Sequence, residues 1–226
     1  MKDRILLSEA SLAAALQGRQ EPDPRKEEPE TTDFKGEYFT PLSDAEVPKR
    51  YRSTLAKYRQ LAREHGFATT AVCHRVRAGY TLKRHAPKAG PCHERFQYLQ
   101  GWDFPDEPTV DSYVFWIPLI LAGSTYKSTH DQRALLAKLR TRLDLPVPHL
   151  RGFGKVALVA GLILTHFEAT GERSALVART DTCIVGGRRL SLSWHEGALR
   201  CVRWDVGDGP FGDVGVFALG VEVLGS

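Results

Sequence analysis

The sequence predicts an α+β fold, in which an antiparallel sheet with a C-terminal β-meander packs against two or three helices. Two observations carry this prediction. Apolar residues recur at helical spacing in segments 48–65, 129–145 and 154–168, whereas the chain from Ala175 onward breaks into short β-rich runs separated by turn residues. The content of 42% apolar and 26% charged residues is ordinary for a globular protein and argues against collagenous, disulfide-scaffold and wholly disordered classes.

The length of 226 residues favours one large domain with an appendage. The longest apolar stretch, Val156 to Leu164, is far shorter than the roughly 20 residues that a membrane-spanning helix needs. The short Ile5-Leu6-Leu7 run lacks the continuous apolar core expected of a secretory signal, and Asp3 and Glu9 argue against an organelle transit peptide. We therefore expect a cytoplasmic protein with no membrane contact, whose cysteines are free thiols.

The first 33 residues are expected to form a flexible arm, followed by a single domain over 34–226. Ser8 to Gln17 has the capping serine and apolar spacing of a short helix. Gly18 to Asp33 contains three prolines and no apolar residue, so it cannot offset the entropy of ordering a chain.

The sequence of the first part of the domain predicts a helix followed by a strand. Pro48 to His65 carries an apolar stripe and ends at Gly66, a residue favoured after a helix. Thr69 to Tyr80 alternates in polarity, as a half-buried strand does. Lys83 to Pro91 is expected to be a loop, and Phe96 to Trp102 a second strand.

The centre of the chain predicts a buried strand and two helices. Tyr113 to Leu121 is apolar on both faces, although Pro118 indicates an edge or a bulge. The next helix is expected to be capped by Thr129, with Asp131 in its first turn and Pro146 at its end. Its apolar stripe consists of Leu135, Leu136, Leu139 and Leu143.

Gly154 to Glu168 is apolar almost all round, which predicts a buried helix despite Gly161; a pair of strands is the alternative. Four short runs then predict an antiparallel meander: 175–185, 188–194, 199–206 and 214–224. The breaks between them have the composition of tight turns or loops: Gly186-Gly187, His195-Glu196-Gly197 and Asp205 to Asp213.

The C-terminal third resembles a bacterial family of unknown function. In that family an apolar helix ending near a histidine precedes a Gly-Arg-Arg strand, a Trp strand and a closing Gly-Val strand. The matching residues here are Gly161 to His166, Gly187-Arg188-Arg189, Trp194, Trp204 and Gly215-Val216. The resemblance implies no activity.

Basic residues with interleaved tyrosines gather between Lys49 and Lys88, which is typical of a nucleic-acid-binding face. A solvated helix face is the simpler explanation, because the net charge is only +4 and the isoelectric point about 8.9. The residues expected to bind an anion on this face are Arg52, Arg59, Arg63, Arg75, Arg77, Lys83 and Arg84.

A second candidate anion site is the loop from Gly123 to His130, where Lys127 and Thr129 are the expected ligands. It lacks the spacing of a phosphate-binding loop, so a plain capping loop is the competing interpretation. If the protein were an enzyme, His130 or His166 would be the candidate general base.

Cys73-His74 and Cys92-His93 have the ligand types of a zinc site, but adjacent residues of a strand point to opposite faces. We therefore expect buried thiols and ordinary histidines rather than a metal site, and the same thiols are weak candidates for a nucleophile. The Asp205 to Asp213 loop lacks EF-hand spacing and is expected to be a β-loop.

These features favour a non-enzymatic binding module, without a cofactor, whose basic face meets RNA or an acidic protein surface. The competing hypothesis is a small enzyme with an anion pocket at residues 123–130 and a histidine base. A phage or defence-system component would look the same at this level. Neither the partner nor the oligomeric state follows from the sequence.

Overall fold

The computed structural model describes residues 37–68, 70–93, 103–174, 177–184, 189–203 and 213–225. The contacts of the chain divide it between Thr32 and Asp33, and all described residues belong to the second unit. The expected helix at Ser8 to Gln17, the arm and the strand at Phe96 to Trp102 fall outside the described residues. So do the Gly186-Gly187 turn and all but Asp213 of the acidic loop.

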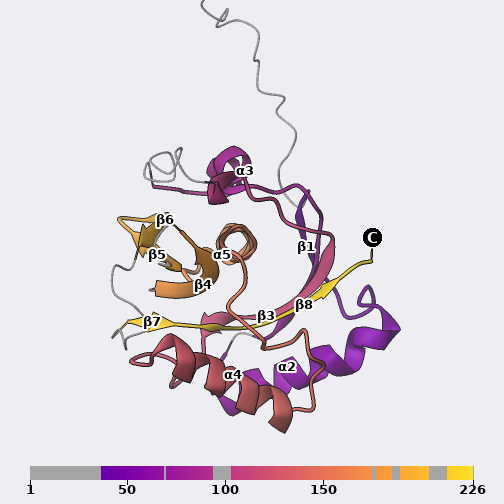
Figure 1. Cartoon of the computed structure of the whole chain (residues 1–226). Coiled ribbons are helices and arrows are strands. Elements are labelled where there is room, and N and C mark those ends of the chain that lie inside the picture. The colour runs from indigo at the N-terminus through magenta and orange to yellow at the C-terminus, as the bar shows by residue number, and fades with distance from the viewer. Residues whose placement is uncertain are drawn as a thin grey trace, which may run out of the picture. The chain divides into compact units, whose positions relative to one another are not determined.

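Two four-stranded sheets make up the β-structure of the described residues (Figure 1). The first sheet has the order β1-β2-β3-β8 and is antiparallel throughout. Its strands are β1 (Phe39–Leu42), β2 (Val72–Val76), β3 (Ser112–Ile120) and β8 (Phe217–Val223). The second sheet has the order β6-β5-β4-β7, with β4 and β7 parallel. Its strands are β4 (Val177–Cys183), β5 (Arg189–His195), β6 (Ala198–Arg203) and β7 (Val214–Gly215).

Helices cover both faces of the first sheet (Figure 1). On one face, α5 (Val156–Thr170) lies between the two sheets, with α3 (Leu82–Ala89) and the short η3 (Phe104–Asp106) beside it. On the other face lie α2 (Arg52–Glu64), preceded by η1 (Lys49–Tyr51), and α4 (Thr129–Arg142). Alternate residues of β3 serve the two cores: Val114 and Trp116 pack on the α5 side, Phe115 and Ile117 on the α2 side.

The predicted buried helix is confirmed as α5, in which every residue from Val156 to Leu164 is buried. Gly161 is required by packing, because a Cβ atom there would lie 2.1 Å from Cζ of Phe39 on β1. The helix ends at Thr170 and is capped by Gly171, whose φ of 73° is the left-handed conformation that glycine adopts without strain.

The helix predicted from Pro48 is confirmed as η1 and α2, and Gly66 follows it with a φ of 70°. For α4, the prediction that Asp131 lies in the first turn is confirmed, but the predicted residues at the two ends of the helix are wrong. Ser128, not Thr129, is the cap, because its Oγ accepts a hydrogen bond from the Asp131 amide. The helix stops at Arg142, before Pro146 can end it.

Pro118 marks a bulge, one of the two predicted alternatives. The pairing of β3 with β8 changes register between Trp116 and Ile120, and Pro118 lies in that interval. Because β3 lies between β2 and β8, the proline is accommodated by the irregularity and not by an edge position.

Two predictions in the first half are wrong. The expected loop from Lys83 is the helix α3, capped by Thr81 and containing Pro87, and it forms because Leu82 and Ala86 are buried against the core. The strand expected from Thr69 to Tyr80 is only β2, and it is covered on both faces, with Cys73 in the α2-side core.

The C-terminal runs confirm an α+β fold with a meander formed by β4, β5 and β6. Glu196 and Gly197 both have positive φ, 49° and 86°, as a two-residue hairpin turn between β5 and β6 requires. The last strand does not extend this meander. Instead β8 joins the first sheet beside β3, so the end of the chain connects the two sheets.

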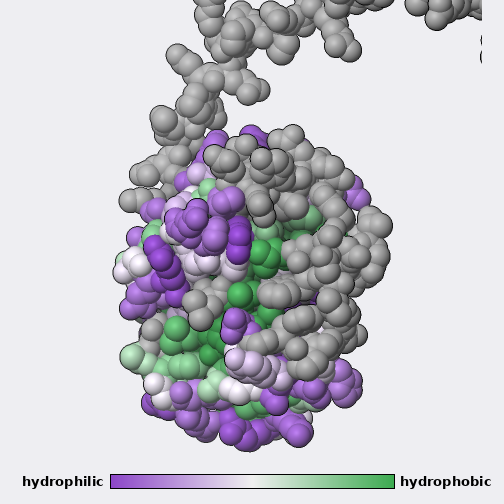
Figure 2. Space-filling model, turned by 90° about the vertical axis from the view of Figure 1, so that its left-hand side faces the viewer, coloured by the Kyte–Doolittle hydropathy of each residue, from purple (hydrophilic) through white to green (hydrophobic). Residues whose placement is uncertain are grey.

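Polar residues dominate the lower rim of the face shown in Figure 2, at the base where Figure 1 places α4, and an apolar area lies in the middle of that face. Within the described part of the chain, no helix has both the length and the apolar character to cross a bilayer.

Candidate functional site

Three arginines of α2 line a hollow of about 310 Å³ on its outer surface, together with Asp44, Leu55 and Ala56. These are Arg52, Arg59 and Arg63, and they share one stripe because their spacings are close to whole turns of an α-helix. The opposite side of α2 carries Tyr58 and Leu61 into the core, which fixes the arginine stripe on the outside. We call this stripe the α2 surface.

The three guanidinium groups have different partners. Arg52 donates to the carbonyls of Val47 and Ala45, both at 3.2 Å. Arg59 donates two hydrogen bonds to the carboxylate of Asp44, which lower the pKa of that carboxyl group and raise the pKa of the guanidinium. Arg63 is exposed, and its side chain makes no hydrogen bond or ion pair with any described residue. The hollow therefore carries three positive charges and one negative charge.

Four side chains from η1 and the first sheet form a row in which two neighbouring aromatic rings lie between two cations. The guanidinium of Arg50 lies 4.7 Å from the ring centre of Tyr51, and that of Arg75 lies 5.6 Å from the ring centre of Tyr113. The two tyrosine rings are 5.3 Å apart. Arg75 is held by Asp111 at 2.9 Å. We call these four residues the cation–aromatic ladder.

The remaining predicted residues of the basic face do not gather with the α2 surface. Lys83 and Arg84 belong to α3, on the opposite side of the first sheet, and Lys83 pairs with Asp106 at 3.1 Å. Arg77 is exposed after the end of β2. The first sheet thus separates Lys83 and Arg84 from the arginines of α2.

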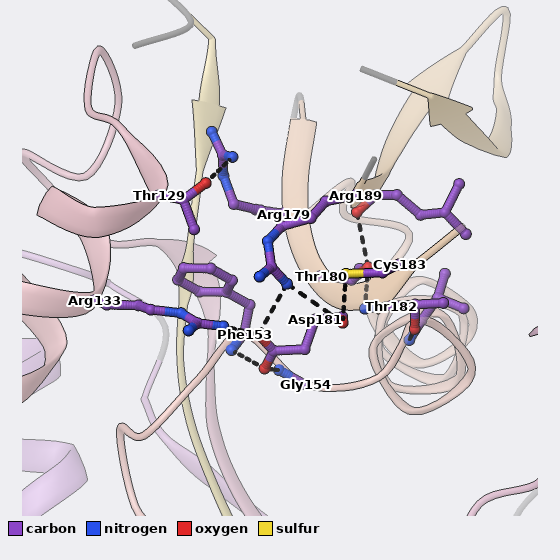
Figure 3. Close-up of polar contacts among 12 residues, drawn as sticks. Thr129, Arg133, Phe153, Gly154, Arg179, Thr180, Asp181, Thr182, Cys183 and Arg189 are labelled. Carbon is purple, nitrogen blue, oxygen red and sulfur yellow. Dashed lines mark hydrogen bonds and ion pairs between the residues drawn. The ribbon is translucent and has the colours of Figure 1, made fainter. Parts of the chain in front are cut away.

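The hydroxyl groups of Ser124 and Thr129, in the 123–130 loop, bind the protein's own atoms. Thr129 is buried and accepts a hydrogen bond from Arg179 at 2.6 Å (Figure 3). Ser124 accepts one from the amide of Val216, and the side chain of Gln132 donates to the carbonyls of Ser124 and Val214. These contacts support the capping-loop interpretation.

Lys127 is half-buried and forms no hydrogen bond with a described residue, so its ammonium group is not engaged by the loop. Sequence reasoning missed Gln132 and Arg179, because nothing local distinguishes a buried polar residue from a solvated one.

The two candidate histidine bases lie on different helices, on opposite sides of the first sheet. His130 on α4 is 89% exposed beside Asp131. His166 on α5 packs against the edge of Trp116 and lies 3.6 Å from Glu172. Burial lowers the pKa of His166, and Glu172 partly opposes that shift.

The two Cys-His pairs are not brought together. Cys73 is in the α2-side core, whereas His74 packs beside Trp116 on the other face. Cys92 donates to the carbonyl of Ala86, and the ring of its neighbour His93 lies near that of His195.

Among the described residues, no three His, Cys, Asp or Glu side chains are close enough to hold a metal ion. Burial raises the pKa values of Cys73 and Cys92 to about 12, so both thiols stay protonated at neutral pH.

Comparison of the chain with models of protein families, with curated proteins and with solved structures gives no match. The fold and the surface therefore define the protein as an α+β protein with a helix-borne arginine stripe beside a cation–aromatic ladder.

Proposed function

We propose that this protein is a non-enzymatic binding module that holds RNA on the α2 surface and the cation–aromatic ladder. The observation that carries the proposal is the stripe of Arg52, Arg59 and Arg63 along one hollow, in which Arg63 has no partner of its own among the described residues.

The electrostatics of the α2 surface support an anionic partner. Guanidinium groups form paired hydrogen bonds with phosphate oxygens, and single-stranded nucleic acids are bound by a groove of such groups that follows the backbone. Asp44 neutralises Arg59 alone, so the hollow keeps a positive excess. Arg52 and Arg59 are also held in place by protein atoms, which reduces the entropy lost when a phosphate binds.

The cation–aromatic ladder favours RNA over an acidic protein surface. Tyr51 and Tyr113 are half-buried rings beside the arginines, and aromatic rings next to cations are the kind of platform on which unpaired bases stack. An acidic peptide uses the charges but gains little from the rings. The two kinds of partner can therefore be distinguished by comparing the affinity of the protein for RNA with its affinity for a polyanion that has no bases.

The test measures the fluorescence anisotropy of a labelled single-stranded RNA of mixed sequence, at about 50 and 200 mM salt, because phosphate contacts weaken steeply over that range. The double variant Arg59→Glu/Arg63→Glu is expected to bind at least tenfold more weakly than the wild type. The control is Lys138→Glu, a single charge reversal at an exposed lysine of α4. It should bind like the wild type.

Two results would contradict the proposal: no RNA binding at the lower salt concentration, or equal losses in the double variant and the control. Polyglutamate that competes as well as RNA would assign the surface to an acidic protein instead.

A further inference from the structure

A second hollow, of about 540 Å³, lies apart from the α2 surface, where α4, the loop before α5, β4, β5 and β8 meet. Its polar wall consists of Arg133 from α4, Arg151 from the loop, Asp181 from β4 and Arg189 from β5. Its apolar wall includes Pro148, Leu219 and Val221. None of these residues belongs to the α2 surface or the ladder.

The carboxylate of Asp181 organises the polar wall (Figure 3). Its Oδ2 accepts hydrogen bonds from the amides of Phe153 and Gly154, at 2.7 and 3.1 Å. Its Oδ1 accepts one from Arg133 at 3.0 Å and lies 3.7 Å from Arg189. Gly152 permits this close approach, because a Cβ atom there would lie 2.3 Å from Oδ2. The loop that carries Arg151 is therefore fixed against β4.

The same arrangement leaves a positive excess in the hollow. Arg133 and Arg189 each use one nitrogen on the Asp181 carboxylate and keep further N–H donors, and Arg133 is steadied by packing over Phe153 at 5.5 Å. Arg151 is exposed and makes no hydrogen bond or ion pair with a described residue. The hollow is thus lined by three guanidinium groups and one carboxylate, and the other lining residues carry no charge.

We propose that this hollow binds a small phosphorylated molecule, with its phosphate held by Arg133, Arg151 and Arg189. A phosphate ester carries close to two negative charges at neutral pH, which balances the net charge of three arginines and Asp181. Guanidinium groups also match the geometry of phosphate oxygens. The volume lies in the range of pockets for small organic ligands and exceeds the need of a bare phosphate ion. Leu219, Val221 and Pro148 supply an apolar surface for the organic part.

The test titrates the full chain by calorimetry with two phosphate esters, AMP and glucose 6-phosphate. The comparison ligands are adenosine and glucose, which lack the phosphate, and inorganic phosphate, which lacks the organic part. At least one phosphate ester is expected to bind at least tenfold more tightly than its uncharged counterpart and more tightly than inorganic phosphate. The variant Arg151→Gln should weaken this binding about tenfold at an unchanged melting temperature, because Arg151 supports no contact of the fold. The control Arg140→Gln, two turns further along α4, should change nothing.

Four outcomes would overturn the proposal. In the first, the protein binds neither ester. In the second and third, it binds an ester no more tightly than the uncharged counterpart, or no more tightly than inorganic phosphate. In the fourth, the Arg151→Gln variant binds the ester with wild-type affinity. A phosphoserine peptide that binds more tightly than both esters would also overturn it in favour of a protein partner. The proposal stands or falls independently of RNA binding, since Arg151→Gln is expected to leave RNA affinity unchanged.

Discussion

The imidazole of His149 joins β8 to α2, with its Nε2 2.8 Å from the Glu222 carboxylate and its Nδ1 3.3 Å from the hydroxyl of Tyr58. Because an ionised carboxylate only accepts, Nε2 carries the hydrogen and Nδ1 accepts from Tyr58. Gly220 lies directly against this chain of hydrogen bonds, since a Cβ atom there would be 2.0 Å from Nδ1 and 2.4 Å from the Tyr58 oxygen. The contact fixes α2, and with it the arginine stripe, onto the first sheet.

Gly220→Ala is therefore expected to destabilise the protein by about 2 kcal/mol, the usual cost of overpacking a core, with Tyr58 and His149 displaced. Urea unfolding monitored by tryptophan fluorescence measures the change. Gly225→Ala is the control, because a Cβ atom there meets nothing within 4 Å. Equal stability of the two variants would show that the hydrogen-bonded chain is not tightly packed.

The buried His74 makes the stability depend on pH. Burial lowers its pKa to about 3, so the folded protein keeps this imidazole neutral where the unfolded chain, titrating near 6.5, takes up a proton. The unfolded state then binds more protons, and the free energy of unfolding falls as the pH falls from about 6.5. The pKa values of His85, His149 and His166 are lowered as well, so they act in the same direction.

When the pH is lowered from 7 to 5, the free energy of unfolding should fall in both proteins. In His74→Leu this fall should be about 2 kcal/mol smaller than in the wild type. Urea unfolding at the two pH values gives this difference. Parallel losses in both proteins would mean that His74 becomes protonated in the folded state.

Thiol reactivity separates the four cysteines. Cys183 is exposed on β4, whereas burial raises the pKa values of Cys73, Cys92 and Cys201. Since the thiolate is the reactive form, a disulfide reagent at pH 8 should promptly modify one thiol per native chain and all four only after unfolding. Cys183→Ser should abolish the prompt reaction. Prompt modification of a second thiol would contradict the burial of the others.

Asp44 is expected to reduce the affinity of the α2 surface for RNA, because its carboxylate accepts the hydrogen bonds of Arg59 and repels phosphate. Asp44→Asn is expected to strengthen RNA binding about threefold, mainly through faster association. Stopped-flow fluorescence with the labelled RNA measures both rate constants. Weaker binding would mean that Asp44 is needed to position Arg59 for the partner.

Strong local periodicity is what made parts of the fold predictable. The apolar stripe of 48–65 predicted α2, the all-round apolar character of 154–168 predicted α5, and the residue pattern of β3 predicted a buried strand. The helix α3 was missed because Pro87 and Gly90 suggested a loop, while the burial of Leu82 and Ala86 that stabilises the helix depends on distant elements. No local signal reveals that β8 leaves the meander to pair with β3.

The candidate sites divide in the same way. Arg52, Arg59 and Arg63 could be grouped from helical spacing alone, whereas nearness in the sequence wrongly suggested that Lys83 lies with them. The contacts of Asp181 join residues far apart in the chain, so only the structure reveals them.

The salt dependence of RNA binding by the wild type and by Arg63→Gln tests the central claim most directly. Arg63 has no partner in the described structure, so its loss removes a phosphate contact without disturbing the fold. The account predicts weaker binding and a slope of log affinity against log salt that is shallower by about 0.7, the value for one phosphate contact with a single strand. An unchanged affinity and slope would contradict the assignment of the α2 surface to RNA.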